Sequence, residues 1–239
     1  MREVFDRVEN QSVVAIEVDV EADEFEKNNH WLFSVFVKSD ITDIESDSFF
    51  EFLETKESLI IALEHEQKAK YVGTRVNEGW NEFYFYSKNS KNLESVAALM
   101  LKDSGYKYEC SIVKDAKWDF YHKNLFPSEL EFHNIQSDKI IFLLQEEGDI
   151  VSITRDVEHY ASFDTATQKD RFVQNALLNG FEFKDDISTE EFEHGVALIK
   201  KHSVINEEVK KIVEQLHNLI KKEHGYYEGW STLLAEKDD

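Results

Sequence analysis

Three side chains that could carry out acid–base chemistry lie close together in the second half of the chain: Arg155, Glu158 and His159. An arginine, a carboxylate and an imidazole in one site can bind an anion and move a proton. The segment that holds them has the pattern of a β-strand, however, and successive side chains of a strand point to opposite faces of its sheet. Arg155 and His159 are therefore predicted to lie on one face and Glu158 on the other. This split favours a structural or interface role over catalysis, and we expect Arg155 to pair with a carboxylate across the sheet.

An aromatic cluster follows the last predicted helix. It contains Tyr226, Tyr227 and Trp230, flanked by Gly225 and Gly229. Large amphipathic rings are common at binding hot spots, and they also close hydrophobic cores. We predict that Trp230 closes a core and that the two tyrosines contact a partner.

Carboxylates crowd the segment between Lys184 and Glu193, which is predicted to be an exposed linker. The residues predicted to attract a basic partner there are Asp185, Asp186, Glu190 and Glu191. The candidate site therefore combines these acids with the aromatic cluster and the Arg155–His159 segment.

The sequence contains no metal or cofactor signature. None of the nine histidines is followed by another at i+4, and Cys110 is the only cysteine, so zinc-site spacing and intramolecular disulfides are both lacking. No glycine-rich phosphate loop and no Gly-x-Ser-x-Gly elbow occurs. We therefore predict no cofactor, no metal and no enzymatic activity.

The chain is strongly acidic throughout its 239 residues. Its net charge of -22 comes from 49 acids and 27 bases, and it is spread over both halves. Phosphate contacts need a basic footprint, so direct binding to nucleic acid or to an anionic membrane is disfavoured. Such a surface would attract a basic partner over long range, although acidity that serves only solubility is an open alternative.

Four sequence blocks occur in a characteristic order in the second half: Gly148-Asp149-Ile150, Arg155-Asp156-Val157-Glu158-His159-Tyr160, Gly180-Phe181-Glu182-Phe183 and Gly225-Tyr226-Tyr227-Glu228-Gly229-Trp230. Together they resemble the RraB family, bacterial regulators of ribonuclease E activity, which are small acidic proteins that act by binding. The resemblance covers roughly residue 135 to the C-terminus. In the family we would expect Arg-Glu-Val-Asp-His-Trp at residues 155–160 and Tyr-Asp-Gly-Trp-Glu-Thr at residues 227–232. These differences bear on the identity of the partner more than on the fold.

The order of predicted elements indicates two domains. In the first half, apolar periodicity predicts strands at residues 14–20, 31–37, 71–76, 82–86 and 106–113 and helices at 48–67 and 92–102. The first two strands are predicted to be neighbours. This pattern resembles an uncharacterised bacterial domain family that often precedes RraB-like domains. Residues 115–131, which contain the lone Pro127, fit neither period and are interpreted as connecting chain with a short turn.

The second half is predicted to hold helices at residues 137–147 and 165–179 and strands at 153–163, 181–183 and 196–204. A last helix starts at Asn206, which we expect to cap it, and ends at Gly225. Gly105 and Gly180 both stand between a helix and a short aromatic strand, which hints at an internal duplication. We predict an α+β protein with two α/β-sandwich domains of the ferredoxin-like sort, in which helices pack on one face of an antiparallel sheet. The predicted boundaries are 1–126 for an N-terminal domain of unknown function, 127–134 for a linker and 135–239 for the RraB-like domain.

The resemblance implies a non-enzymatic regulator or adaptor whose acidic domain binds a basic protein segment, namely the scaffold region of an RNA-degrading ribonuclease. Two alternatives stay open: an enzyme that uses carboxylates at the domain junction on a small polar or cationic substrate, and an acidic immunity or inhibitor protein for a basic toxin. Neither a signal-type segment nor a run of about 18 apolar residues is present, so we expect a cytoplasmic protein. The oligomeric state does not follow from the sequence.

Overall fold

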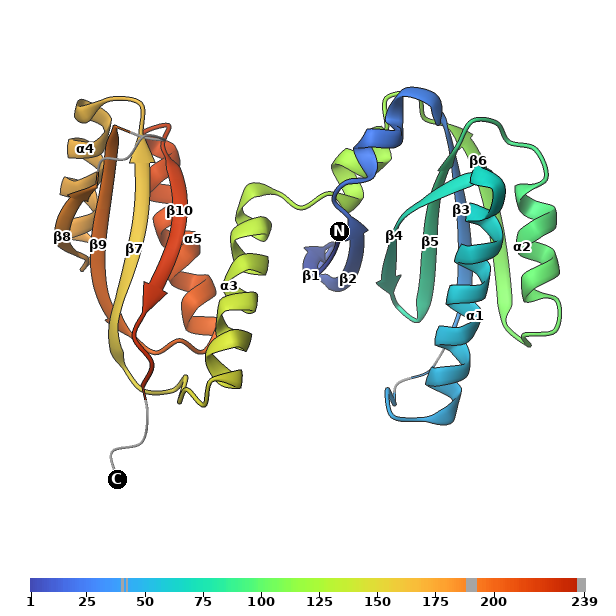
Figure 1. Cartoon of the computed structure of the whole chain (residues 1–239), viewed down its shortest axis with the longest axis horizontal. Coiled ribbons are helices and arrows are strands. Elements are labelled where there is room, and N and C mark those ends of the chain that lie inside the picture. Colours follow the sequence, from blue (N-terminus) through green and yellow to red (C-terminus); the bar gives the residue numbers. More distant parts are fainter. Residues whose placement is uncertain (40, 42, 188–192, 236–239) are drawn as a thin grey trace. The chain divides into compact units, whose positions relative to one another are not determined.

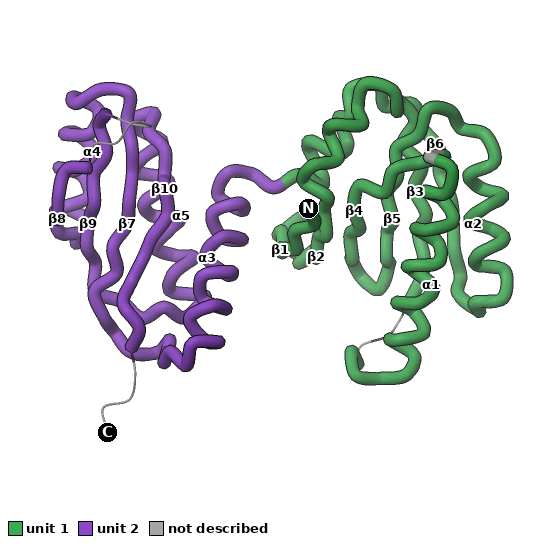
Figure 2. The backbone as a smooth tube through the Cα atoms, viewed as in Figure 1, with its two compact units in different colours: residues 1–126 green, residues 127–239 purple. Residues whose placement is uncertain are grey.

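The computed structural model describes residues 1–39, 41, 43–187 and 193–235. It divides the chain into two compact units, residues 1–126 and 127–239 (Figure 2). Each unit has its own sheet and its own buried apolar cluster. The predicted α+β class with two antiparallel sheets is confirmed.

The first unit is built on a six-stranded antiparallel sheet in the order β1-β2-β4-β5-β3-β6 (Figure 1). Its elements are β1 (Arg2–Glu9), β2 (Ser12–Asp19), the short 3₁₀ helix η1 (Ala22–Asn28), β3 (Trp31–Lys38), α1 (Asp47–Glu64), the 3₁₀ turn η2 (His65–Gln67), β4 (Ala69–Asn77), β5 (Trp80–Ser87), α2 (Leu93–Leu101) and β6 (Lys107–Lys114). From β3 to β6 the chain follows the βαββαβ order of a ferredoxin-like sandwich. The hairpin β1–β2 widens this sheet at the edge formed by β4.

Two expectations for the first unit were wrong. The strands predicted to be neighbours, at residues 14–20 and 31–37, are separated in the sheet by β4 and β5. The neighbours of β2 are β4 and β1, and β1 was not predicted. The alternation in β1 is inverted with respect to hydrophobicity, since Glu3 is buried whereas Val4 and Val8 are exposed. Periodicity therefore gave no signal for an edge strand of this kind.

The sheet of the first unit is covered on both faces. α1 and α2 cover one face, and the segment after β6 covers part of the other with three fully buried side chains, Trp118, Tyr121 and Leu125. The Trp118 ring is stacked on Tyr86 with 3.9 Å between the ring centroids, and its Nε1 donates to the carbonyl oxygen of Asn29 at 2.5 Å. This segment, interpreted from the sequence as connecting chain, is therefore part of the first core. It includes the π-helical turn η3 (Tyr121–Leu125).

The second unit contains α3 (Glu129–Glu146), β7 (Arg155–Phe163), α4 (Ala166–Leu178), β8 (Glu182–Ile187), β9 (His194–His202), α5 (Asn206–Lys222) and β10 (Tyr226–Thr232). The antiparallel sheet has the order β10-β7-β9-β8. From β7 to β10 this is again βαββαβ with a ferredoxin-like strand order. α3 precedes it and packs beside α5.

α3 begins earlier than predicted. A capping box formed by Ser128 and Glu131 starts the helix at Glu129, so residues 129–134 of the expected linker are helical. α5 begins at Asn206, but its N-cap is Ile205 and no side chain caps it. The expected cap at Asn206 was therefore wrong.

Each unit contains a ferredoxin-like sandwich, but the two similar helix–glycine–strand segments at Gly105 and Gly180 are not topologically equivalent. Gly105 precedes β6, the fourth strand of its sandwich, whereas Gly180 precedes β8, the second strand of the other. The topological equivalent of Gly105 is Gly225, which precedes β10. The two glycines that looked alike thus occupy different places in the fold.

Because each unit has a separate core, cleavage between Phe126 and Pro127 is expected to leave two fragments that fold alone. Each fragment should show its own cooperative thermal transition by circular dichroism. A fragment that is disordered when isolated, while the intact chain is folded, would contradict this expectation.

Candidate functional site

Among the described residues of the second unit, no helix covers one face of the sheet. The inward-facing residues of β7 and β9, such as Val157 and Val196, pack against α4 and α5, whereas residues at the alternate positions face away from the helices (Figure 1). We call this surface the open face. Its members are Glu158, Tyr160, Ser162, Lys184, Asp185, Tyr226, Glu228 and Ser231.

A polar network crosses the centre of the open face. Glu158 accepts a hydrogen bond from the Tyr160 hydroxyl at 2.9 Å and pairs with Lys184 on β8. The Lys184 ammonium lowers the pKa of the Glu158 carboxyl below its usual range. Tyr160 and Ser231 of β10 are hydrogen-bonded at 2.7 Å. Glu158 is therefore an ionised carboxylate at the surface. It lies on the face of the sheet opposite to that of Arg155 and His159, as the strand alternation predicted.

A hollow lies at one edge of this face, next to the end of β7 and the starts of β9 and β10. Its volume is about 410 Å³, and its lining residues are Ser162, Phe163, Asp164, Glu193, His194, Tyr226 and Glu228. Three of these are carboxylates, and the Ser162 hydroxyl donates to Glu228. We call this feature the acidic hollow. Its chemistry suits a lysine or arginine side chain, which can form charge-assisted hydrogen bonds with several carboxylates at once.

A β-bulge in β10 presents Glu228 to the hollow. The register of β10 on β7 shifts between Tyr227 and Gly229, so Glu228 is the extra residue of the strand. Gly229 has φ +116°, a backbone conformation that favours glycine. An acid followed by glycine inside an aromatic strand was the available sequence signal for this bulge.

Arg155 lies in the interior of the unit. Its guanidinium forms two hydrogen bonds with Asp149, at 2.5 and 2.7 Å, and further ones with the carbonyl oxygens of Ile150, Ile153 and Leu233. The expected carboxylate partner exists, but it lies in the loop before β7 and not across the sheet. The same Asp149 accepts from the backbone nitrogen of Ala235 at 2.9 Å. Arg155 thus fastens the chain after β10 to the loop before β7.

His159 belongs to a buried chain of hydrogen bonds. Its Nε2 lies 3.1 Å from Nε2 of His202, and its Nδ1 lies 2.9 Å from the Tyr227 hydroxyl. His202 Nδ1 donates to the carbonyl oxygen of Ser203 at 2.7 Å, so its Nε2 accepts. His159 Nε2 must then donate, and Tyr227 must donate to His159 Nδ1. Both imidazoles are neutral in this arrangement.

The other predicted residues occupy different positions. Trp230 is buried, and its Nε1 donates to the Ser137 hydroxyl at 3.0 Å. Tyr226 is exposed, with the Lys221 ammonium 5.3 Å from its ring centroid. Asp185 and Asp186 lie on β8, which extends to Ile187 and replaces part of the expected linker.

Asp185 is on the open face, whereas Asp186 pairs with Lys169 of α4 at 2.5 Å. Glu190 and Glu191 lie outside the described residues. Among the described residues, the structure therefore brings Glu158, Asp185 and Tyr226 onto the open face. Sequence reasoning missed Asp164 and Glu228, the carboxylates that line the acidic hollow beside Glu193.

The buried histidines predict a pH-dependent stability for the second unit. Burial lowers the pKa of His159 to about 3 and also lowers that of His202. Below pH 6.5 the unfolded chain therefore binds protons that the folded unit does not, so stability is present above this pH and is lost as the pH falls. The contribution of His159 should amount to about 1.4 kcal/mol per pH unit.

Urea unfolding at pH 7 and pH 5 measures this dependence. The pH 7 to pH 5 loss should be smaller in a His159→Gln variant, whereas His65→Gln, at an exposed position of the first unit, should leave it unchanged. An equal loss in all three proteins would show that other groups set the pH response.

In the described part of the chain, no group of three or more His, Cys, Asp or Glu residues is arranged to hold a metal ion. None of the helices in this part is long and apolar enough to cross a membrane. Burial raises the pKa of the Cys110 thiol to about 11, which keeps it protonated at neutral pH.

Two protein-family models match the chain. Residues 134–232 match the family "Regulator of ribonuclease activity B", or RraB, and residues 5–126 match DUF695, a family of unknown function. Both resemblances inferred from the sequence are confirmed, and the two matches fall on the two units. A comparison with curated proteins found no match. One similar solved structure is described as an unknown protein from Galdieria sulphuraria; it has 8% identity and a TM-score of 0.20 and covers 84% of this chain and 96% of that one.

Proposed function

Because the chain belongs to the DUF695 family through its first unit and carries an RraB domain in its second, we propose that it is a cytoplasmic, non-enzymatic regulator. In this proposal the second unit binds a basic segment of a ribonuclease and thereby changes the rate of RNA decay. The match of residues 134–232 to the family "Regulator of ribonuclease activity B" supports this role. The basic segment and the mode of binding are parts of the proposal.

The acidic hollow is the observation that most supports this function. It lies on a sheet face that no helix of the described residues covers, and its three carboxylates are Asp164, Glu193 and Glu228. The exposed Tyr226 ring stands beside them. A lysine or arginine of the partner would enter the hollow while neighbouring residues lie along the polar network of Glu158.

Binding of this kind requires no contact with RNA. The second unit has a net charge of -10 from Asn134 onward, with 12 Lys and Arg against 22 Asp and Glu. Phosphates would be repelled, whereas a basic peptide would be attracted over the screening length of about 8 Å at physiological ionic strength. The association rate should therefore fall as salt rises.

The test is an RNA-decay assay with purified endoribonuclease from the same organism and a labelled RNA. Addition of the chain should change the cleavage rate, and the double variant Asp164→Lys/Glu228→Lys should need a roughly 10-fold higher concentration for the same effect. Asp170→Lys and Glu214→Lys are matched controls, because both acids are exposed on helices away from the open face.

Surface plasmon resonance between the chain and the ribonuclease should show the same order of affinities. The control variants should bind like the unaltered chain. A ribonuclease that neither binds the chain nor changes its cleavage rate would overturn the proposed function. Equal loss of binding in the hollow and control variants would overturn the assignment of the hollow.

A further inference from the structure

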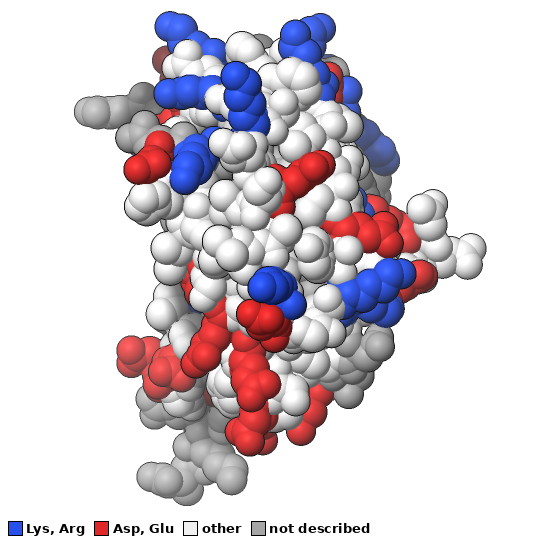
Figure 3. Space-filling model, turned by 90° about the vertical axis from the view of Figure 1, so that its right-hand side faces the viewer, with Lys and Arg blue, Asp and Glu red and all other residues white. Residues whose placement is uncertain are grey.

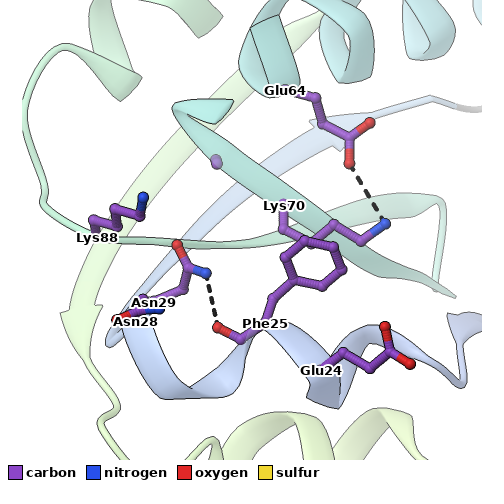
Figure 4. Close-up of a pocket in the computed structure, with 8 residues that line it drawn as sticks. Glu24, Phe25, Asn28, Asn29, Glu64, Lys70 and Lys88 are labelled. Atoms are coloured by element: carbon purple, nitrogen blue, oxygen red, sulfur yellow. Dashed lines mark hydrogen bonds and ion pairs between the residues drawn. The ribbon is translucent and has the colours of Figure 1, made fainter. Parts of the chain in front are cut away.

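A second hollow lies in the first unit, far in sequence from the acidic hollow. It has a volume of about 430 Å³ and is formed by η1, the end of α1, the start of β4 and the chain after β5. Figure 4 shows the side chains that line it, among them Glu24, Phe25, Asn29, Glu64, Lys70 and Lys88. Neither the RraB match nor the proposed function involves this hollow.

Asn29 presents an unused acceptor to the hollow. The residue is more than nine-tenths buried. Its Nδ2 donates to the Phe25 carbonyl oxygen at 2.8 Å, which sets the orientation of the amide, and its own carbonyl oxygen accepts from Trp118. Oδ1 therefore points into the hollow, as Figure 4 shows, and has no hydrogen-bond partner within the described chain. Solvent reaches this oxygen from the hollow, so an N–H group of a bound molecule can replace a water molecule there.

The charged groups of the hollow lie on two sides of the Phe25 ring, and the Lys70 ammonium lies on the same side as the carboxylates. Figure 4 shows Lys88 and the two asparagines on one side of the Phe25 ring and Glu24 and Glu64 on the other. Among the residues that the structure describes, neither Lys88 nor Glu24 has an ion pair or a side-chain hydrogen bond.

Lys70 only partly neutralises the acidic side. Its ammonium is 2.9 Å from Asp19 but 3.8 Å from Glu64. Glu64 also accepts from the backbone nitrogen of Tyr71 at 3.0 Å, so Glu24 is the lining carboxylate that retains the capacity to bind a second cation. Phe25, which is 45% exposed, offers an apolar surface between the two ends.

Charge is also separated on the face of the first unit that Figure 3 shows. Figure 3 shows Lys and Arg side chains gathered at the end where α2 begins and β6 ends, and Asp and Glu side chains toward the other end. Exposed lysines of this basic end include Lys88, Lys91, Lys114 and Lys117. The hollow lies beside this basic end, because Lys88 belongs to both. The net charge of the unit therefore does not describe the electrostatic field at the hollow.

We propose that this hollow binds a small zwitterion of the amino-acid or dipeptide class. Its carboxylate lies at Lys88, its ammonium lies at Glu24, and its apolar part lies on the Phe25 ring. Asn29 Oδ1 accepts a hydrogen bond from an N–H group of the ligand. A purely anionic ligand would be repelled by the two carboxylates, and a purely cationic one by Lys88 and Lys70, so a molecule with both charges fits both ends best.

The test uses the full chain and three probes: alanyl-alanine, its N-acetyl form and its C-terminal amide. Titration followed by two-dimensional NMR should give saturable shifts at the residues of the hollow with alanyl-alanine. Each capped form lacks one charge and should bind about 10-fold more weakly. Absence of saturable shifts with alanyl-alanine up to about 10 mM, or equal binding of all three probes, would overturn the proposal.

Two variants distinguish the ends of the ligand. Lys88→Gln should weaken binding of alanyl-alanine and of the N-acetyl form but not of the amide, whereas Glu24→Gln should weaken alanyl-alanine and the amide but not the N-acetyl form. The matched controls are Lys91→Gln and Asp23→Asn, which are exposed nearby but do not line the hollow. Variants that behave like these controls would contradict the assigned site. The RNA-decay assay is independent of this outcome, because the acidic hollow belongs to the other unit.

Discussion

Replacing Asp149 with alanine is expected to lower the free energy of unfolding of the second unit by about 3–5 kcal/mol. The carboxylate is fully buried, and the Arg155 side chain that it binds is 9% exposed. Alanine would leave the guanidinium charge buried and unpaired. It would also remove the acceptor of the Ala235 backbone N–H. Both losses act on the segment that joins the end of β10 to the loop before β7.

Chemical unfolding of the isolated second unit, residues 127–239, followed by tryptophan fluorescence measures this loss, because Trp230 is its only tryptophan. Asp156→Ala is the matched control: this acid is exposed, and its nearest cation, Lys201, is 3.9 Å away. The control should change stability by at most about 1 kcal/mol. A double variant, Asp149→Leu/Arg155→Met, should be less destabilised than Asp149→Ala, because it leaves no unpaired charge. A loss of under about 1 kcal/mol in Asp149→Ala would show that water reaches Arg155 and replaces the ion pair.

Replacing Trp118 with alanine is expected to destabilise the first unit by about 3–5 kcal/mol. The indole is fully buried, is stacked on Tyr86 and contacts Tyr121 edge-on. Its removal leaves a large cavity on the face of the sheet opposite α1 and α2, and it removes the hydrogen bond to Asn29. The segment after β6 would then lose its main contact with the core.

Thermal unfolding of the isolated first unit, residues 1–126, monitors this change. Lys117→Ala alters the neighbouring exposed residue and should leave the transition temperature unchanged. Truncation of Trp118 without loss of stability would mean that residues 115–126 act as a linker, as the sequence alone suggested. The second unit should unfold as before in a full-length Trp118→Ala chain, because it has a separate core.

The sequence predicted most of the elements that bury a regular apolar stripe. α5 is the clearest case, since Val209, Ile212, Val213, Leu216 and Ile220 recur at helical spacing and all are buried. The strands predicted at 71–76 and 82–86 form the hairpin β4–β5, whose turn at Glu78-Gly79 has positive φ angles at both residues. In these places local periodicity and turn chemistry agree with the tertiary fold.

β10 was missed because its periodicity is broken. Strict alternation would place Tyr227 and Trp230 on opposite faces of a strand, yet both face inward, opposite Ala161 and His159 of β7. The bulge at Glu228 adds one residue and restores the inward direction. Without the register against β7, the sequence shows only an aromatic cluster.

By itself, then, the sequence determined the fold class, the two family resemblances and an acidity spread over both units, because these depend on local pattern and composition. Only the tertiary structure decided which groups meet. It placed Arg155 and His159 in the interior, where Asp149 and His202 satisfy them, and it brought Asp164 and Glu228 together although 64 residues separate them in the chain. Strand order and bulges set such encounters, and both arise from pairing between distant segments that no local pattern records.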